Sequence, residues 1–158
     1  MLVETIIEAP AWEDLDLASL AERAAVAVLA QFGQPPEGYL IALLGCNDAR
    51  IAELNGDFRD RPTPTNVLSW PITELEMRLP PPGAPDDPEE LGDIAIAYET
   101  CAAEAATAGI SLSHHVTHLI VHAMLHLLGY DHQTDAEAQR MENLETAILV
   151  SMGHPDPY

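Results

Sequence analysis

Residues 114–132 read HHVTHLIVHAMLHLLGYDH, and this stretch decides both the expected fold and the expected site. His122 and His126 are four residues apart. On a helix that spacing places two imidazoles on one face, about 6 Å apart at their Cβ atoms. Gly129 can end the helix in the left-handed conformation, which lets His132 return toward the pair. Three converging neutral imidazoles predict a zinc site with an open fourth position, the arrangement typical of catalytic zinc.

The alternative interpretation is that these histidines are packed side chains of an apolar helix. One histidine on such a helix is usually a core residue, and a pair at helical spacing is still weak evidence. The third histidine, placed beyond a glycine, favours a metal site. The pairs His114/His118 and His118/His122 have no third ligand after a turn. We therefore expect His114, His115 and His118 to be solvated or to lie beside the ligands.

The residue after the first ligand bears on the reaction class. The spacing H-x-x-x-H-x-x-G-x-x-H equals that of the metzincin zinc peptidases, which carry a Glu directly after the first His as general base. Ala123 occupies that position here. The sequence thus predicts the ligand geometry without the peptidase base.

The charge of the chain is strongly acidic. Asp and Glu number 26 against six basic residues, all of them Arg, for a formal net charge of −20. Such a chain does not attract nucleic acid through its overall field. Arg59, Arg61 and Arg78 form a candidate local basic patch; the alternative is that they only balance nearby acids.

Other features of the composition point to an ordinary cytoplasmic protein. No apolar run is long enough to cross a membrane, and the N-terminus lacks a basic region before an apolar one. Cys46 and Cys101 form no C-x-x-C pair, so we expect both to be buried, reduced thiols.

The pattern of apolar residues, turns and caps predicts an α+β fold. The helix that carries the histidines is apolar nearly all round, which is typical of a helix buried at the centre of a fold. We expect HPDPY, residues 154–158, to be a loose tail with His154 unengaged. We expect one domain over residues 1–158, with a single four-stranded sheet and about five helices, the central one carrying two of the three ligand histidines. The expected strands cover residues 2–8, 39–44, 67–70 and 94–98. The expected helices begin at about 14 or 16, 47 or 48, 99, 111 or 113, and 134 or 135, and they end near 32, 55–56, 108, 128 and 152. Residues 79–90 are expected to be an exposed loop.

Several motifs together resemble one known family. HAMLHLLGYDH is similar to the YbeY signature H-G-x-L-H-L-x-G-Y-D-H, with Ala123 for the usual Gly. Further matches are Leu54, Asn55, Phe58 and Arg59 to L-N-x-x-[FY]-R, residues 65–71 (TNVLSWP) to the family's T-D/N-V-L-S-F-P, and residues 91–94 to L-G-D-I. The resemblance covers most of residues 54–132.

This resemblance implies a zinc-dependent endoribonuclease with one zinc per chain, held by His122, His126 and His132. It would act in ribosomal RNA maturation, at the 3′ end of small-subunit rRNA, and in ribosome quality control. Arg59 matches the arginine that the family uses in its active site, so Arg59 and His122 are the expected catalytic residues. An arginine offers phosphate a fixed charge and a planar fork of donors.

The resemblance leaves several roles open. The proton acceptor is Asp131, His118 or a ribose hydroxyl, and Ser69 joins Asp131 and His118 as a candidate for contacting the ligands or the substrate. One alternative function is another zinc hydrolase, such as a peptidase, which Ala123 disfavours. Another is a ribosome-assembly factor whose zinc is only structural. The implied partners are ribosomal RNA and the small ribosomal subunit, together with a basic ribosomal protein that the acidic surface could meet, and no membrane.

Overall fold

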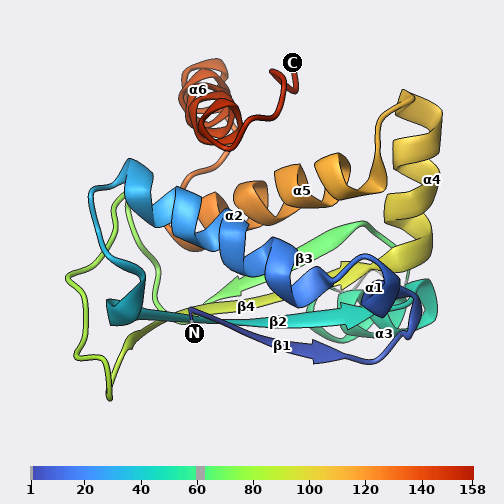
Figure 1. Ribbon diagram of the computed structural model, residues 1–158, viewed down its shortest axis with the longest axis horizontal. Helices are drawn as coiled ribbons and strands as arrows, with labels where there is room; N and C mark the ends of the chain where they lie inside the picture. Colours follow the sequence, from blue (N-terminus) through green and yellow to red (C-terminus); the bar gives the residue numbers. More distant parts are fainter. Residues whose placement is uncertain (1, 60–62) are drawn as a thin grey trace.

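Four strands form one mixed sheet in the computed structural model, which describes residues 2–59 and 63–158 and omits the side chains of residues 58 and 59 (Figure 1). The strand order is β1-β2-β4-β3. β1, β2 and β4 run parallel, and β3 pairs antiparallel with β4 at one edge. The single four-stranded sheet predicted from the sequence is confirmed. The strands are β1 (Val3–Ile7), β2 (Tyr39–Cys46), β3 (Val67–Pro71) and β4 (Glu89–Ala97).

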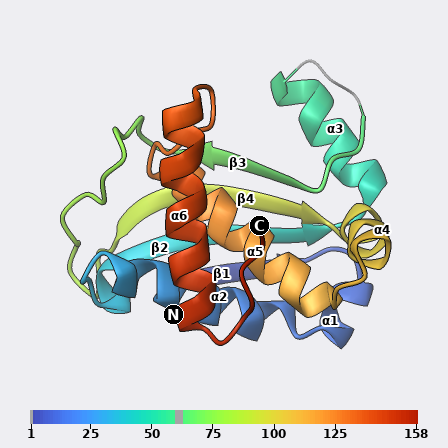
Figure 2. The same ribbon diagram turned by 90° about the horizontal axis from the view of Figure 1, so that it is seen from above.

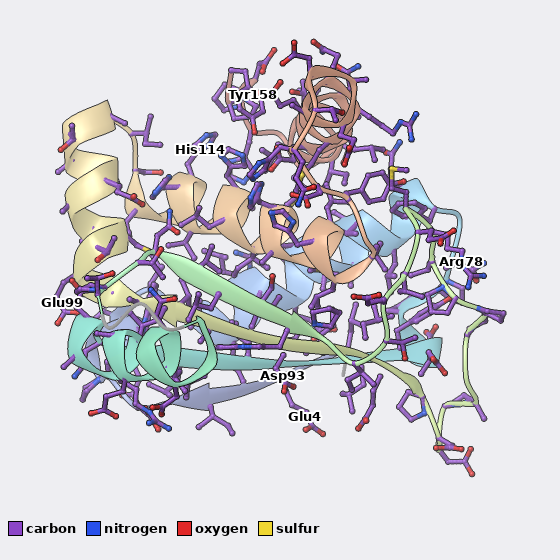
Figure 3. The ribbon with its side chains drawn as sticks, turned by 180° about the vertical axis from the view of Figure 1, so that it is seen from behind. Glu4, Arg78, Asp93, Glu99, His114 and Tyr158 are labelled. Carbon is purple, nitrogen blue, oxygen red and sulfur yellow. The ribbon has the colours of Figure 1, made fainter. Side chains whose placement is uncertain are left out.

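Helices form two further layers above one face of this sheet. α2 and α5 lie side by side on the sheet, and α6 crosses α5 on the side away from the sheet (Figures 1 and 2). The opposite face is more open: α3 covers part of it, where Ile51 packs with Ala95 and Ala97, and Glu4 and Asp93 point outward from the rest (Figure 3). The helices are α1 (Ala11–Asp14), α2 (Leu17–Gln31), the 3-10 helix η1 (Pro36–Gly38), α3 (Asp48–Arg59), α4 (Tyr98–Ala108), α5 (Leu112–Leu127) and α6 (Asp135–Ser151).

α5 is the central helix that the sequence predicted. Its N-cap is Ser111, whose hydroxyl accepts a hydrogen bond from the backbone N–H of His114 at 3.1 Å. Its apolar side chains are buried against α2, α4, α6 and the sheet. Close packing against these neighbours holds side chains in fixed rotamers, so polar groups along the helix have defined positions.

Some element boundaries differ from those expected. α2 begins directly after Asp16 and ends at Gln31, as expected, but the short helix α1 precedes it, and Asp16 separates the two with a φ of 54°. α3 continues to Arg59 rather than ending near residue 55. β4 begins at Glu89 rather than residue 94, because Glu89 pairs with Tyr39 at the start of β2. The acidic, proline-rich segment before it is tied to β2 where the Tyr39 hydroxyl donates to the carbonyl oxygen of Pro80 at 2.6 Å.

Both cysteines are free and buried, as expected. Burial raises the pKa of the Cys46 thiol to about 11 and raises the pKa of the Cys101 thiol as well, so neither is a reactive thiolate at neutral pH. Across residues 2–59 and 63–158, the helices are too short or too polar for any to span a bilayer.

Candidate metal centre and cleft

A Schellman turn at the end of α5 brings the predicted ligands together. The backbone N–H of Gly129 donates to the carbonyl of His126 at 3.0 Å, and that of Tyr130 donates to the carbonyl of Leu125 at 3.0 Å. This pair of bonds requires a left-handed residue at the turn, and Gly129 has a φ of 96°. The chain therefore reverses after Gly129, and His132 returns toward the end of α5.

His122, His126 and His132 converge as the spacing predicts. One ring nitrogen from each lies within 4.8 Å of the others, so the three could hold a metal ion. The Nε2 atoms of His122 and His126 are 3.0 Å apart. The ring centroids of His126 and His132 are 5.4 Å apart. His122 and His126 are partly buried and His132 is exposed, which leaves one side of the centre open to solvent.

The outer nitrogens of the two helical histidines are already engaged. Nδ1 of His122 lies 2.5 Å from Oε1 of Glu145, and Nδ1 of His126 lies 2.9 Å from the carbonyl oxygen of Tyr130. Both partners are acceptors, so each Nδ1 carries the proton and each Nε2 presents a lone pair toward the other. A ligand histidine that donates its second N–H to a carboxylate or carbonyl is the usual arrangement at protein metal sites. The donor set fits zinc, which prefers neutral imidazole and needs few ligands.

Glu145 is a site residue that the sequence prediction missed. It lies on α6, and its side chain is 0% exposed. Burial alone would raise the pKa of this carboxyl, but hydrogen bonds from His118, His122 and Tyr158 outweigh it and hold the pKa at about 2. A carboxylate therefore faces the ligand histidines at neutral pH. The only signal in the sequence is an acid at a position of α6 flanked by the apolar Met141, Ile148 and Leu149.

Tyr158 is the second missed residue, and its position corrects the expectation of a loose tail. Its hydroxyl donates to Oε2 of Glu145. The edge of its ring packs against His118, with ring centroids 5.6 Å apart. His118 in turn lies 3.4 Å from Oε1 of Glu145. His118 therefore lies beside the ligands, which was one of the two positions expected for it. Figure 3 shows Tyr158 over α5 next to α6.

The first turn of α5 differs from expectation. His114 is buried rather than solvated, and its Nδ1 lies 3.1 Å from Nδ1 of His154, which was expected to be unengaged. Burial lowers the pKa of His114, and the neighbouring His154 lowers it further. His115 pairs with Glu104 on α4 through a 2.9 Å contact. These contacts anchor α5 and the segment after α6 to their neighbours.

A cleft of about 880 Å³ lies above the three histidines. One wall is β3, including Ser69, and another is α5, including Ala123. Asp131 is the one acid among the described residues that line the cleft. Its Oδ1 accepts the backbone N–H of His132 at 2.8 Å, so Asp131 shapes the turn that carries the third histidine.

The cleft continues to the end of α3. Asn55 and Asn66 line it there, and the Asn55 side chain donates to the carbonyl of Thr63 at 3.0 Å. Arg59 is the last residue of α3, one turn after Asn55, but its side chain lies outside the described residues. Arg61 lies outside them entirely, so the expected arginine patch stays a prediction.

Comparisons with known proteins agree with this geometry. The family described as Endoribonuclease YbeY matches residues 8–153. A curated Endoribonuclease YbeY from Cereibacter sphaeroides is 56% identical over 99% of this chain and 98% of its own length. Another from a Jannaschia species is 51% identical over 100% of both chains. The solution structure of a Thermotoga maritima protein shares the fold, with a TM-score of 0.59 at 18% identity over 96% of this chain and 92% of that one. The chain belongs to the Endoribonuclease YbeY family.

Proposed function

We propose that this protein is a zinc-dependent endoribonuclease that acts in the cytoplasm on ribosomal RNA. We further propose that it acts in maturation of the 3′ end of small-subunit rRNA and in ribosome quality control. Two relatives that are 56% and 51% identical carry the curated name Endoribonuclease YbeY, which supports a nuclease acting on RNA. The converging histidines support the metal, because three imidazoles, two of them with engaged outer nitrogens, are a zinc donor set.

The observation that carries the reaction class is the identity of the residue after the first ligand. Ala123 lines the cleft beside His122, where a zinc peptidase would place its glutamate. The acid that does line the described part of the cleft, Asp131, is held by the backbone of His132. Peptide hydrolysis needs a carboxylate that passes a proton to the leaving amine. An RNA substrate supplies its own 2′-hydroxyl, so the cleft is better suited to a phosphodiester.

In this proposal the three histidines bind zinc, and Arg59 stabilises negative charge on the phosphate. Zinc, when bound, lowers the pKa of water and polarises a phosphoryl oxygen. His122, His126 and His132 would hold it at the floor of the cleft. Arg59 offers the phosphate a fixed positive charge and two parallel donors, which stabilise charge that develops on the phosphoryl oxygens. Its place at the end of α3, one turn after the cleft residue Asn55, supports this role.

The proposed partners are ribosomal RNA and the small ribosomal subunit. A net charge of −20 repels RNA at long range, so RNA binding requires local contacts in the cleft. The same acidic surface is complementary to a basic ribosomal protein. Docking on such a protein would bring the cleft to its substrate.

Metal depletion separates a catalytic from a purely structural zinc. We expect protein stripped of metal by a chelator to keep its far-UV circular dichroism spectrum and to lose cleavage of small-subunit rRNA. One equivalent of zinc should restore the activity. Protein that unfolds when stripped would support the structural alternative, and cleavage that persists without metal would contradict the proposal.

A further inference from the structure

Glu145 and Tyr158 lie on the outer side of the candidate metal centre and are not among its ligands. Glu145 projects from α6 toward α5, and its carboxylate is completely buried. A buried carboxylate is costly unless hydrogen bonds satisfy both oxygens. Oε1 lies 2.5 Å from Nδ1 of His122 and 3.4 Å from Nε2 of His118, and Oε2 accepts a hydrogen bond from the hydroxyl of Tyr158. Histidines thus contact one oxygen, and the tyrosine contacts the other.

His122 and His126 differ in what holds them. His126 donates to a backbone carbonyl that the Schellman turn fixes in place. His122 donates to a carboxylate on the end of a flexible side chain that belongs to another helix. A carboxylate that can rotate would not fix the imidazole, so its second oxygen must be held. The Tyr158 hydroxyl supplies that second contact.

The segment that carries Tyr158 is itself attached to both helices. His154 contacts His114 at the start of α5. The hydroxyl of Thr146 on α6 lies 3.3 Å from Oδ1 of Asp156, and that oxygen also accepts the backbone N–H of Tyr158 at 2.9 Å. These contacts explain how a residue that is 61% exposed still presents its hydroxyl to a buried carboxylate.

We propose that Tyr158 and Glu145 act as one positioning unit for His122: the tyrosine hydroxyl fixes the carboxylate, and the carboxylate holds the imidazole with Nε2 toward the metal. This inference rests on the metal site of the proposed function. Neither residue belongs to the cluster of three histidines, so both act on the centre through His122. Loss of such an outer partner typically weakens a metal site by about 10- to 100-fold.

Zinc affinity of the purified protein tests the unit directly. Competition against a chromophoric chelator gives the zinc Kd of the wild type, Tyr158→Phe, Glu145→Gln and the double variant. We expect Tyr158→Phe to weaken zinc binding by about 10-fold and Glu145→Gln by up to about 100-fold. The double variant should match Glu145→Gln alone, because Tyr158 acts only through the carboxylate.

Matched controls and a second readout exclude a general loss of structure. Tyr98→Phe removes a hydroxyl from a tyrosine packed on Trp12, and Glu53→Gln removes an exposed carboxylate from α3; neither should change the Kd. In zinc-free protein, nitrogen-15 spectra of labelled histidine should show His122 protonated at Nδ1 in the wild type. Tyr158→Phe and Glu145→Gln should shift it toward a mixture of tautomers.

The outcomes separate this inference from the function on which it rests. A wild type that binds no stoichiometric zinc would overturn the proposed function. A wild type that binds zinc, with Tyr158→Phe at the same affinity and the same His122 tautomer, would overturn the positioning unit alone. Losses that multiply in the double variant would also overturn it, because they would show two independent effects.

Discussion

His126 and Tyr130 are joined across the end of α5, where Nδ1 of the histidine lies 2.9 Å from the carbonyl oxygen of the tyrosine. The turn that ends the helix therefore also orients one of the three convergent histidines. The turn requires glycine at position 129 for two reasons. Gly129 takes a φ of 96°, and the backbone of Leu75 packs directly against it, which leaves no room for a side chain. A Cβ at Gly129 would lie 1.8 Å from the carbonyl oxygen of Leu75.

The first prediction follows from that contact. We expect Gly129→Ala to lower the free energy of unfolding by more than about 2 kcal/mol, since a left-handed alanine costs about 1–2 kcal/mol before any overlap. Zinc binding should weaken with it. The control is Gly109→Ala, which ends α4 at a φ of 70° with open space around the added Cβ. Urea denaturation should show a loss of only about 1–2 kcal/mol for Gly109→Ala, the backbone cost without the overlap. Equal losses for the two variants would show that the contact with Leu75 is unimportant.

The second prediction concerns Arg59. We expect Arg59→Glu to abolish cleavage of structured RNA while leaving zinc stoichiometry and the thermal midpoint unchanged, because the arginine would bind phosphate rather than support the fold. Arg61→Glu should matter less. Arg23→Glu is a control with the same change of charge on α2, where the exposed Arg23 donates to the hydroxyl of Ser19 one turn away at 2.6 Å. Wild-type activity in Arg59→Glu would contradict the role.

The third prediction is a loss of stability in acid. Burial lowers the pKa of His126 and His114 below the ordinary value of 6.5, so the unfolded chain binds more protons than the folded one as the pH falls. The free energy of unfolding of the zinc-free protein should therefore decrease as the pH is lowered through about 6.5. Glu145, with a pKa of about 2 against 4.5, should extend the loss below pH 4.5. Urea denaturation across this range measures the slope, and a flat profile would contradict the burial of these groups.

The sequence was a good guide to the elements and to the converging histidines. Periodicity and caps located the four strands and the helices, and the His-to-His spacing across Gly129 predicted the convergence that the structure shows. The sequence did not predict Glu145 and Tyr158 as site residues. Their contacts near His122 depend on how α6 and the segment after it cross α5. Packing between elements has no local pattern in the chain. The same reason explains the early start of β4, which follows from its pairing with β2.

The fourth prediction is a strong dependence of cleavage on salt. Few arginines must bind the phosphates of RNA against a net charge of −20. Salt screens the local attraction in the cleft and adds competing counterions for the phosphates. We expect kcat/KM on small-subunit rRNA to fall at least about 10-fold between about 50 and 300 mM monovalent salt. An unchanged value over that range would contradict binding through arginine–phosphate contacts.

We propose that the three histidines support cleavage of RNA and not of peptides. The most direct measurement incubates zinc-loaded protein with small-subunit ribosomal RNA and, separately, with a peptide library. His126→Ala, prepared identically, is the control because it removes one of the three convergent imidazoles. We expect the wild type to produce RNA fragments and His126→Ala to produce none. The peptides should stay intact with both proteins. Peptide turnover by the wild type, or RNA cleavage that persists in His126→Ala, would contradict it.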